Sequence, residues 1–273
     1  MSDGNRFSVQ FWGVRGSVAV PGPKTVRYGG NTSCLEVRCG EHLIILDAGT
    51  GIRALGYKLL PALPVKTNIY MTHTHFDHIC GLPFFVPLFI PGNKITMWAG
   101  HLQPEYTLKQ VLTEMMMAPL PEVFQADVDY KDFTVGDVLE PHPGIMVRTA
   151  KLNHPNQATG YRIEYEGKSI CYITDTEHPE FGRDPNILEL LQGADLVVYD
   201  SMYTDSTYEN FRGFGHSTWE EGVRLVQAAG AKKLVIFHHD PTHDDDKMDA
   251  IGEEAAKVLP GTVVAKEGMT LSP

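Results

Sequence analysis

The sequence predicts an α/β protein in which two β-sheets pack face to face and helices cover their outer surfaces, an α/β/β/α arrangement. Three observations support this. Short apolar runs of strand length recur along the 273 residues, helical patterns alternate with them, and each half of the chain begins with strands before the alternation starts. A content of 42% hydrophobic and 21% charged residues allows a sizeable core. We therefore expect one domain over residues 1–273, with a helical insertion near residues 103–132.

The first half is expected to supply one sheet. Its predicted strands are Phe7–Trp12, Ser33–Cys39, Leu43–Leu46, Lys66–Met71 and Lys94–Trp98. Its predicted helices are Ile52–Leu60, Ile79–Phe89 and Thr107–Met117. The loop Gly13–Gly30 is rich in glycine and proline, so it is either a plain connector or a functional surface loop.

The second half is expected to supply the other sheet. Its predicted strands are Met146–Leu152, Gly160–Tyr165, Ser169–Ile173, Leu196–Tyr199, Leu234–Phe237 and Val263–Ala265. Its predicted helices are Ile187–Leu191, Thr218–Ala229 and Asp245–Val258. No linker or low-complexity segment divides the halves, which favours a single domain.

Composition limits the classes of function. The net charge of −11 argues against a surface that coats a large nucleic acid. The four cysteines show no C-x-x-C spacing, which is typical of reduced thiols. The longest apolar run, residues 79–90, contains two prolines and is too short to span a bilayer, and no apolar leader begins the sequence. We expect a cytoplasmic protein without membrane contact. The 12 histidines direct attention to metal ligands.

The segment from Thr72 to His78 carries the chemistry. His73, His75, Asp77 and His78 follow directly after a predicted apolar strand. Side chains alternate in an extended segment, so His73 and His75 can face one metal, while the following turn directs Asp77 and His78 towards a second. Imidazole and carboxylate are ligands that Zn²⁺ accepts. The alternative is a polar surface loop that happens to be rich in histidine.

The H-x-H-x-D-H pattern after a strand resembles the signature of the metallo-β-lactamase superfamily. The resemblance implies a four-layer αβ/βα fold with two mixed sheets and two bound metals. It matches His154, Asp175 and His238 to the remaining ligand positions, each after an apolar strand. It implies His73, His75 and His154 on one metal, Asp77, His78 and His238 on the other, and Asp175 between them. His239 competes with His238 for its position, and alternation allows only one of them to face the metals.

Asp47 stands in the segment Leu46–Gly51, which resembles a supporting motif of the superfamily. Its carboxylate would accept a hydrogen bond from the N–H of a ligand imidazole and fix the orientation of the ring. An Asx-turn that serves only the backbone is an equal alternative.

Two further features resemble the ribonuclease Z-like branch. His216 lies in Gly215–Thr218 and Asp200 follows an apolar strand. Asp200 would orient and charge His216, which would protonate the leaving oxygen. The alternative is that His216 merely precedes a helix cap. The segments around Arg15 and Asn31 resemble class II cyclic-nucleotide phosphodiesterases, so we expect both residues to contact substrate, with a solvent-exposed Arg15 as the alternative.

The resemblance implies a dinuclear metal-dependent phosphodiesterase that acts on a cyclic nucleotide or another small phosphodiester by attack of a metal-bridging hydroxide. Asp77, Asp200 and His216 are the expected catalytic residues. Zn²⁺ is the favoured metal, with Mn²⁺ or Fe²⁺ as alternatives. A thioester or lactone hydrolase, a ribonuclease Z-like RNA endonuclease and a non-catalytic sensor or scaffold are the rival functions. The run Met115–Met117 suits ordinary helix packing, an apolar lid or a homodimer surface.

Overall fold

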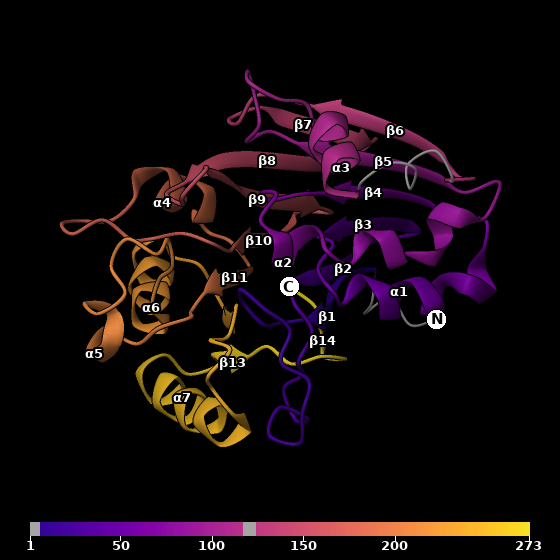
Figure 1. The fold of residues 1–273 in the computed structure, drawn as a ribbon. Coiled ribbons are helices and arrows are strands. Elements are labelled where there is room, and N and C mark those ends of the chain that lie inside the picture. Colours follow the sequence, from indigo (N-terminus) through magenta and orange to yellow (C-terminus); the bar gives the residue numbers. More distant parts are fainter. Residues whose placement is uncertain (1–5, 117–123) are drawn as a thin grey trace.

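The computed structural model describes residues 6–116 and 124–273. Within these residues, two seven-stranded mixed sheets lie against each other, with helices on their outer faces (Figure 1). The predicted α/β/β/α arrangement is therefore confirmed. Over the same residues, no helix is long and apolar enough to cross a membrane.

The first sheet has the strand order β14-β1-β2-β3-β4-β5-β6. Its strands are β1 Phe7–Gly13, β2 Cys34–Cys39, β3 His42–Leu46, β4 Lys66–Tyr70, β5 Lys94–Ala99, β6 Asp127–Asp132 and β14 Thr270–Leu271. Pairing is antiparallel from β14 to β3 and parallel from β3 to β6. The last strand of the chain thus joins the sheet of the first half.

The second sheet has the order β13-β12-β11-β10-β9-β8-β7. Its strands are β7 Val138–His142, β8 Ile145–Leu152, β9 Ala158–Tyr165, β10 Lys168–Ile173, β11 Leu196–Asp200, β12 Leu234–Phe237 and β13 Val263–Val264. Strands β10 to β13 are parallel, so the segments after β10, β11 and β12 emerge at one edge of the sheet.

The helices cover the two outer faces (Figure 1). They are α1 Ile52–Leu59, α2 Phe76–Ile79, α3 Leu108–Met116, α4 Pro185–Leu191, α5 Asp205–Tyr208, α6 Trp219–Ala228 and α7 Asp245–Val258. At the starts of α4, α6 and α7, the side chains of Asp184, Thr218 and Asp244 accept hydrogen bonds from main-chain N–H groups of the first turn.

Three apolar layers hold the sandwich together. The central layer joins both sheets through side chains such as Leu46, Tyr70, Val198 and Phe237. A second layer packs the outer face of the second sheet against α4, α6 and α7, and a third packs the first sheet against α1 and α3. Because the parallel strands β11 and β12 are covered on both faces, every residue of these two strands is buried.

Three expectations about local structure need correction. The predicted helix over residues 79–89 is instead the end of α2 and two short 3₁₀ turns, because Pro83 and Pro87 remove hydrogen-bond donors from a helix interior. The insertion near residues 103–132 holds the edge strand β6 as well as α3, and Met117 lies outside the described residues. Val263–Ala265 does not close the chain, since β14 follows it.

Candidate metal centre

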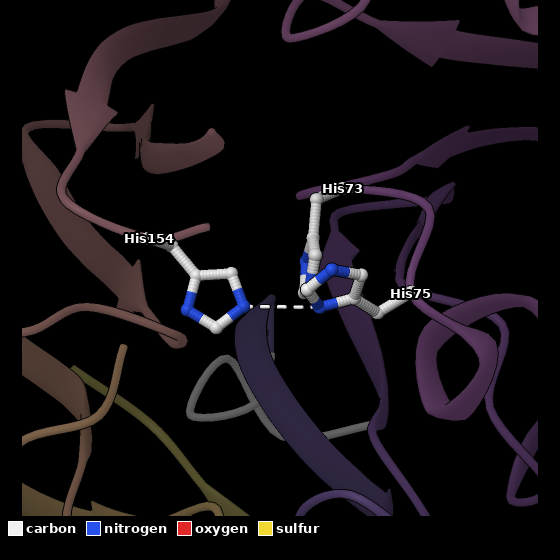
Figure 2. Close-up of side chains that lie close together, drawn as sticks. All are labelled: His73, His75 and His154. Atoms are coloured by element: carbon white, nitrogen blue, oxygen red, sulfur yellow. Dashed lines mark hydrogen bonds between the residues drawn. The ribbon is translucent and has the colours of Figure 1, made fainter. Parts of the chain in front are cut away.

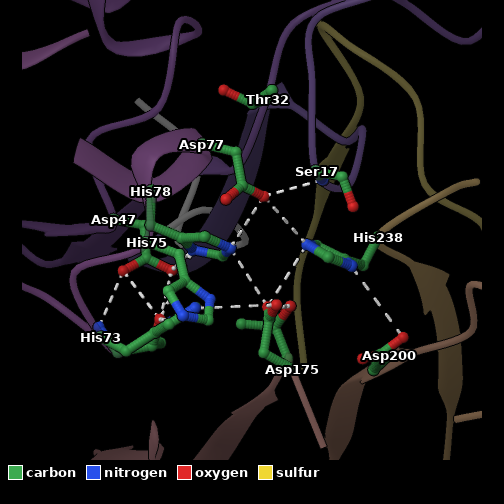
Figure 3. Close-up of polar contacts among 12 residues, drawn as sticks. Ser17, Thr32, Asp47, His73, His75, Asp77, His78, Asp175, Asp200 and His238 are labelled. Carbon is green, nitrogen blue, oxygen red and sulfur yellow. Dashed lines mark hydrogen bonds and ion pairs between the residues drawn. The ribbon is translucent and has the colours of Figure 1, made fainter. Parts of the chain in front are cut away.

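A cluster of histidines and aspartates gathers where strands of both sheets end. Asp47 follows β3, the His73–His78 segment follows β4, Asp175 follows β10 and His238 follows β12. Asp200 is the last residue of β11. The carboxyl ends of parallel strands meet at one edge of each sheet, and Figure 3 shows the side chains from these ends turned towards one another.

Asp175 lies between two groups of imidazoles. Its Oδ1 is 3.8 Å from Nε2 of His73 and 3.7 Å from Nε2 of His154. Its Oδ2 is 3.1 Å from Nε2 of His78 and 3.3 Å from Nε2 of His238. Each carboxylate oxygen therefore faces a different group, which is the geometry of a ligand shared by two ions.

The first group contains His73, His75 and His154 (Figure 2). Nε2 of His154 lies 3.0 Å from Nδ1 of His75, and the His73 and His75 rings meet edge to face at 4.5 Å. Nδ1 of His154 donates a 2.7 Å hydrogen bond to the Gly215 carbonyl oxygen. That bond leaves Nε2 of His154 without a proton and available as a ligand.

The second group contains Asp77, His78 and His238. Oδ2 of Asp77 lies 3.3 Å from Nε2 of His78 and 3.5 Å from Nε2 of His238. The Ser17 amide, in the loop after β1, donates a 2.8 Å hydrogen bond to the same oxygen. Sequence reasoning did not find this contact, because a backbone amide leaves no signal in residue identity.

The donor set fits two divalent cations. Within the described part of the chain, Nε2 atoms of His73, His78 and His238 are buried and have no hydrogen-bond partner. A buried polar atom without a partner is costly, and three such atoms that converge on shared carboxylates are explained by bound metal. A set of five imidazoles and two carboxylates also matches the preference of Zn²⁺.

Asp47 supports the second group from behind. Nδ1 of the buried His78 donates to Oδ2 of Asp47 at 2.8 Å. The Thr72 amide and the Tyr172 hydroxyl also donate to this carboxylate, at 2.8 and 2.9 Å. The imidazole is thereby fixed in the tautomer that presents Nε2 to the cluster, which favours the supporting role over an Asx-turn.

Three residues of the cluster occupy the left-handed backbone region. Asp47, Asp175 and His238 have φ values of 61°, 58° and 61°. Asp47 and His238 directly follow a strand, and Asp175 is the second residue after one. This conformation is costly for residues other than glycine and is concentrated at functional sites. It turns the chain sharply, so that the side chain after the strand points into the cluster.

His216 and Asp200 form a buried pair beside the cluster. Nδ1 of His216 donates to Oδ2 of Asp200 at 3.0 Å, and the His216 and His238 rings stack at 5.0 Å. Oδ2 of Asp200 also accepts from the Thr176 amide at 3.2 Å, and Oδ1 from the Met202 amide at 3.1 Å. The amides fix the carboxylate, and the carboxylate orients the ring.

Charges within the cluster shift the pKa values strongly. Burial opposes the charged form of His216, but the Asp200 carboxylate outweighs burial and raises the pKa of His216 to about 9. Burial likewise opposes ionisation of Asp77, yet His78 and His238 bring its pKa far below the usual range. Burial lowers the pKa of His73 well below its ordinary value, and the neighbouring His78 lowers it further. A neutral His73 is the form that binds a metal.

The two residues expected to contact substrate point elsewhere. Arg15 is fully buried, and its guanidinium donates to the carbonyl oxygens of Gly29 and His243 at 2.8 and 2.7 Å. This geometry favours a structural role over the expected substrate contact or a solvent-exposed side chain. Asn31 donates through Nδ2 to Glu267 at 3.0 Å, so its amide is also engaged within the protein.

The structure separates His238 from its neighbour. Whereas His238 faces the two aspartates, Nε2 of His239 donates to the Ala265 carbonyl oxygen at 2.8 Å. Two further histidines near the cluster were missed by sequence reasoning. His101 bonds Thr74 through Nε2 at 3.2 Å, and His178 bonds Ser217 through Nδ1 at 2.9 Å. His101 comes two residues after the end of β5, the parallel neighbour of β4, and that position could have marked it, whereas His178 lies five residues after β10 with no such signal.

Residues 42–239 match the family described as the beta-lactamase superfamily domain. This span includes every candidate ligand from His73 to His238. The chain belongs to the beta-lactamase superfamily. The family and the histidine–aspartate clusters together identify a metal-dependent hydrolase of the metallo-β-lactamase fold.

Curated relatives carry the name ribonuclease Z. The protein from Parabacteroides distasonis is 28% identical over 91% of this chain and 94% of its own length. The protein from Myxococcus xanthus is 23% identical over 88% of this chain and 92% of its own length. The chain is thus similar to proteins named ribonuclease Z over most of its length.

Solved structures share the fold. The metallo-beta-lactamase fold protein YhfI from Bacillus subtilis has a TM-score of 0.73 at 18% identity, covering 97% of this chain and 99% of its own. A diphosphatase of the PhnP family has a TM-score of 0.71 at 21% identity, covering 98% of both chains. Zn²⁺-bound PqqB from Methylobacterium extorquens has a TM-score of 0.70 at 18% identity, covering 97% of this chain and all of its own.

Proposed function

We propose that this hydrolase is a dinuclear phosphodiesterase that acts on a cyclic nucleotide or another small phosphodiester. The observation that carries the proposal is the arrangement around Asp175. Its two oxygens face separate imidazole groups, and the His216–Asp200 pair lies beside them. A phosphodiester needs both parts, because it is negatively charged and its alkoxide leaving group needs a proton.

Two groups of side chains would hold the metals. His73, His75 and His154 would bind one ion, Asp77, His78 and His238 the other, and Asp175 both. Zn²⁺ fits best, with Mn²⁺ or Fe²⁺ as alternatives. When bound, two such ions supply positive charge for the phosphate oxygens and lower the pKa of water to near neutrality. The protein itself keeps the ligand imidazoles in the correct tautomer through Asp47 and the Gly215 carbonyl oxygen.

His216 is proposed as the general acid. Asp200 accepts the proton-bearing Nδ1, so Nε2 of His216 is the atom that would give a proton to the leaving oxygen. Because Asp200 is held by two backbone amides, the pair is already oriented before substrate binds. A thioester hydrolase would need the metals but no such acid, since its thiolate leaving group is far less basic than an alkoxide. A lactone also expels an alkoxide, so the substrate itself, and not His216, distinguishes a lactone hydrolase from a phosphodiesterase.

The size of the substrate is inferred from charge. The formal net charge of −11 leaves the surface unsuited to a long polyanion, whereas a small phosphodiester meets positive charge only at the buried metals. Ribonuclease Z-like cleavage of RNA is the second candidate, and the similarity to ribonuclease Z along most of the chain favours it. A cytoplasmic location and a homodimer stay predictions.

The decisive experiment is a panel assay of the metal-loaded protein. It compares cyclic nucleotides, a chromogenic diester, a precursor tRNA, a thioester and a lactone at equal metal occupancy. We expect the small diesters to give the highest kcat/KM. A precursor tRNA cleaved far faster would establish the second candidate, and preference for the thioester or lactone would refute a phosphodiesterase.

A further inference from the structure

A cleft of about 390 Å³ opens directly beside the proposed metal centre. One side is formed by the motif residues His73, Thr74 and His75. The other is formed by the segment between β5 and α3, together with α3 itself and the loop after β8. The volume lies within the roughly 300–1,000 Å³ of small-molecule sites. A group attached to a phosphate at the metals would therefore find this cleft adjacent to it.

The side chains of the cleft are suited to a neutral, planar group. Tyr106 is 58% exposed, and Leu102 and Val111 add apolar surface. Asn156 and Gln157 provide amide donors and acceptors. Among the described residues that line the cleft there is no lysine or arginine, and Glu105 adds negative charge. A second phosphate would be repelled, whereas an aromatic ring with polar edges can stack and form hydrogen bonds.

His101 gives independent evidence for a ligand. It lines the cleft although only 6% of it is exposed. Nε2 bonds Thr74 at 3.2 Å, while Nδ1 has no partner among the described residues. A buried ring nitrogen without a partner costs free energy, and such atoms in native proteins are usually explained by a ligand, ion or water.

We propose that this cleft binds the nucleobase of a nucleoside phosphodiester whose phosphate lies at the metal centre. The proposal rests on the phosphodiesterase function and narrows its substrates from small phosphodiesters in general to those that carry a nucleoside. Tyr106 is the stacking surface, and Asn156, Gln157 and Glu105 supply hydrogen bonds to the edges of the base. Specificity then comes from the segment between β5 and α3, which lies outside the metal motif.

The test uses two substrates that share a scissile bond and a leaving group. They are a thymidine 5′-phosphate p-nitrophenyl ester and methyl p-nitrophenyl phosphate. In Tyr106→Ala, we expect kcat/KM for the nucleoside ester to fall about 5- to 150-fold, chiefly through KM, because base–aromatic stacking is lost. The methyl ester should change less than about twofold, since it carries no base. Calorimetry should show weaker binding of thymidine 5′-monophosphate and unchanged binding of inorganic phosphate.

Tyr57→Ala is the matched control, because Tyr57 is similarly exposed but lies on α1. Val111→Trp fills the cleft instead of emptying it and should impair the nucleoside ester alone. Equal effects on both esters, or none on either, would overturn the nucleobase site. Failure of wild-type protein to hydrolyse either ester would instead refute the phosphodiesterase function, so the two failures are distinguishable.

Discussion

The two sheets contribute to the metal centre in different ways. The first sheet presents four potential ligands within six consecutive residues, His73 to His78, after the single strand β4. The second sheet presents one side chain after each of several elements: His154 after β8, Asp175 after β10 and His238 after β12. The ligands of the first sheet are close together in the sequence. Those of the second sheet are far apart in the sequence, and they meet because the strands before them end at the same edge of the sheet.

The support of the ligands differs in the same way. His78 is fixed by side chains, because Asp47 accepts its Nδ1 proton and is itself held by Thr72 and Tyr172. For the three ligands of the second sheet, the support described above comes from the backbone. A carbonyl oxygen orients His154, and left-handed φ values turn Asp175 and His238 into the cluster. Support from a side chain is therefore tested by replacing that side chain with one of the same shape. Support from the backbone is tested by replacing a glycine that lies against the ligand with alanine.

The largest effect is expected where the two halves meet. Asp175→Ala removes the carboxylate whose oxygens face both imidazole groups, so we expect loss of two-metal occupancy and of activity. Elemental analysis after dialysis measures the metal content. Asp129→Ala, on the exposed edge strand β6, is the control and should keep both metals. Two metals still bound to Asp175→Ala would refute the bridging role.

The next largest effect concerns the proton donor of the second half. His216→Ala should lower kcat by about 10²- to 10⁴-fold for a diester with an alkoxide leaving group, the usual contribution of a general acid. A p-nitrophenolate leaving group needs little protonation, so its rate should fall much less. Equal losses for the two leaving groups would show that His216 does not act as an acid.

Asp47→Asn tests the side-chain support of the first half. The variant keeps the shape and tolerates the left-handed conformation, but it removes the charge that accepts the His78 proton. Metal affinity should fall about 10- to 100-fold. Competition with a chelator of known affinity measures the change. An unchanged metal affinity would show that Asp47 serves only the backbone turn and does not support the ligand His78.

Gly215→Ala tests the backbone support of the second half. A Cβ at this position would lie 2.3 Å from Nδ1 of His154, and the residue has a φ of +86°. Gly213→Ala is a matched control, because its φ is +93° but no atom lies within 4 Å of the added Cβ. The backbone strain, about 1–3 kcal/mol, is common to both. We expect a lower Tm and weaker metal binding in Gly215→Ala than in Gly213→Ala. Equal values in the two variants would show that the contact between residue 215 and His154 does not support the metal centre.

The smallest effect is a shift in pH dependence. An acid must be protonated, so activity is lost as the pH rises through the pKa of His216, which Asp200 raises. In Asp200→Asn that pKa falls, and the alkaline limb of the kcat profile should move to lower pH. Asp195→Asn is the control, because Asp195 precedes β11 at the end opposite Asp200 and pairs with Lys168 and Lys232, so it should leave the limb in place. If the alkaline limb of the Asp200→Asn profile stayed at the wild-type pH, Asp200 would not control the pKa of the proton donor.

The sequence by itself determined the features that are local. The period of apolar residues predicted most strands and helices, and the His73–His78 segment predicted a metal centre after a strand. Resemblance then ordered His154, Asp175 and His238, because each follows an apolar strand. Pro83 and Pro87 were also visible, yet the helix expected across them does not form.

Only the tertiary structure decided the features that depend on distant contacts. It buried Arg15 against carbonyl oxygens from Gly29 and His243, joined β14 to the sheet of the first half, and placed His101 in a cleft beside the metals. It also decided which oxygen of Asp175 faces which imidazoles. The physical reason is that side-chain partners and φ values are set by packing between segments far apart in the chain, whereas periodicity reports only which face of each segment is buried.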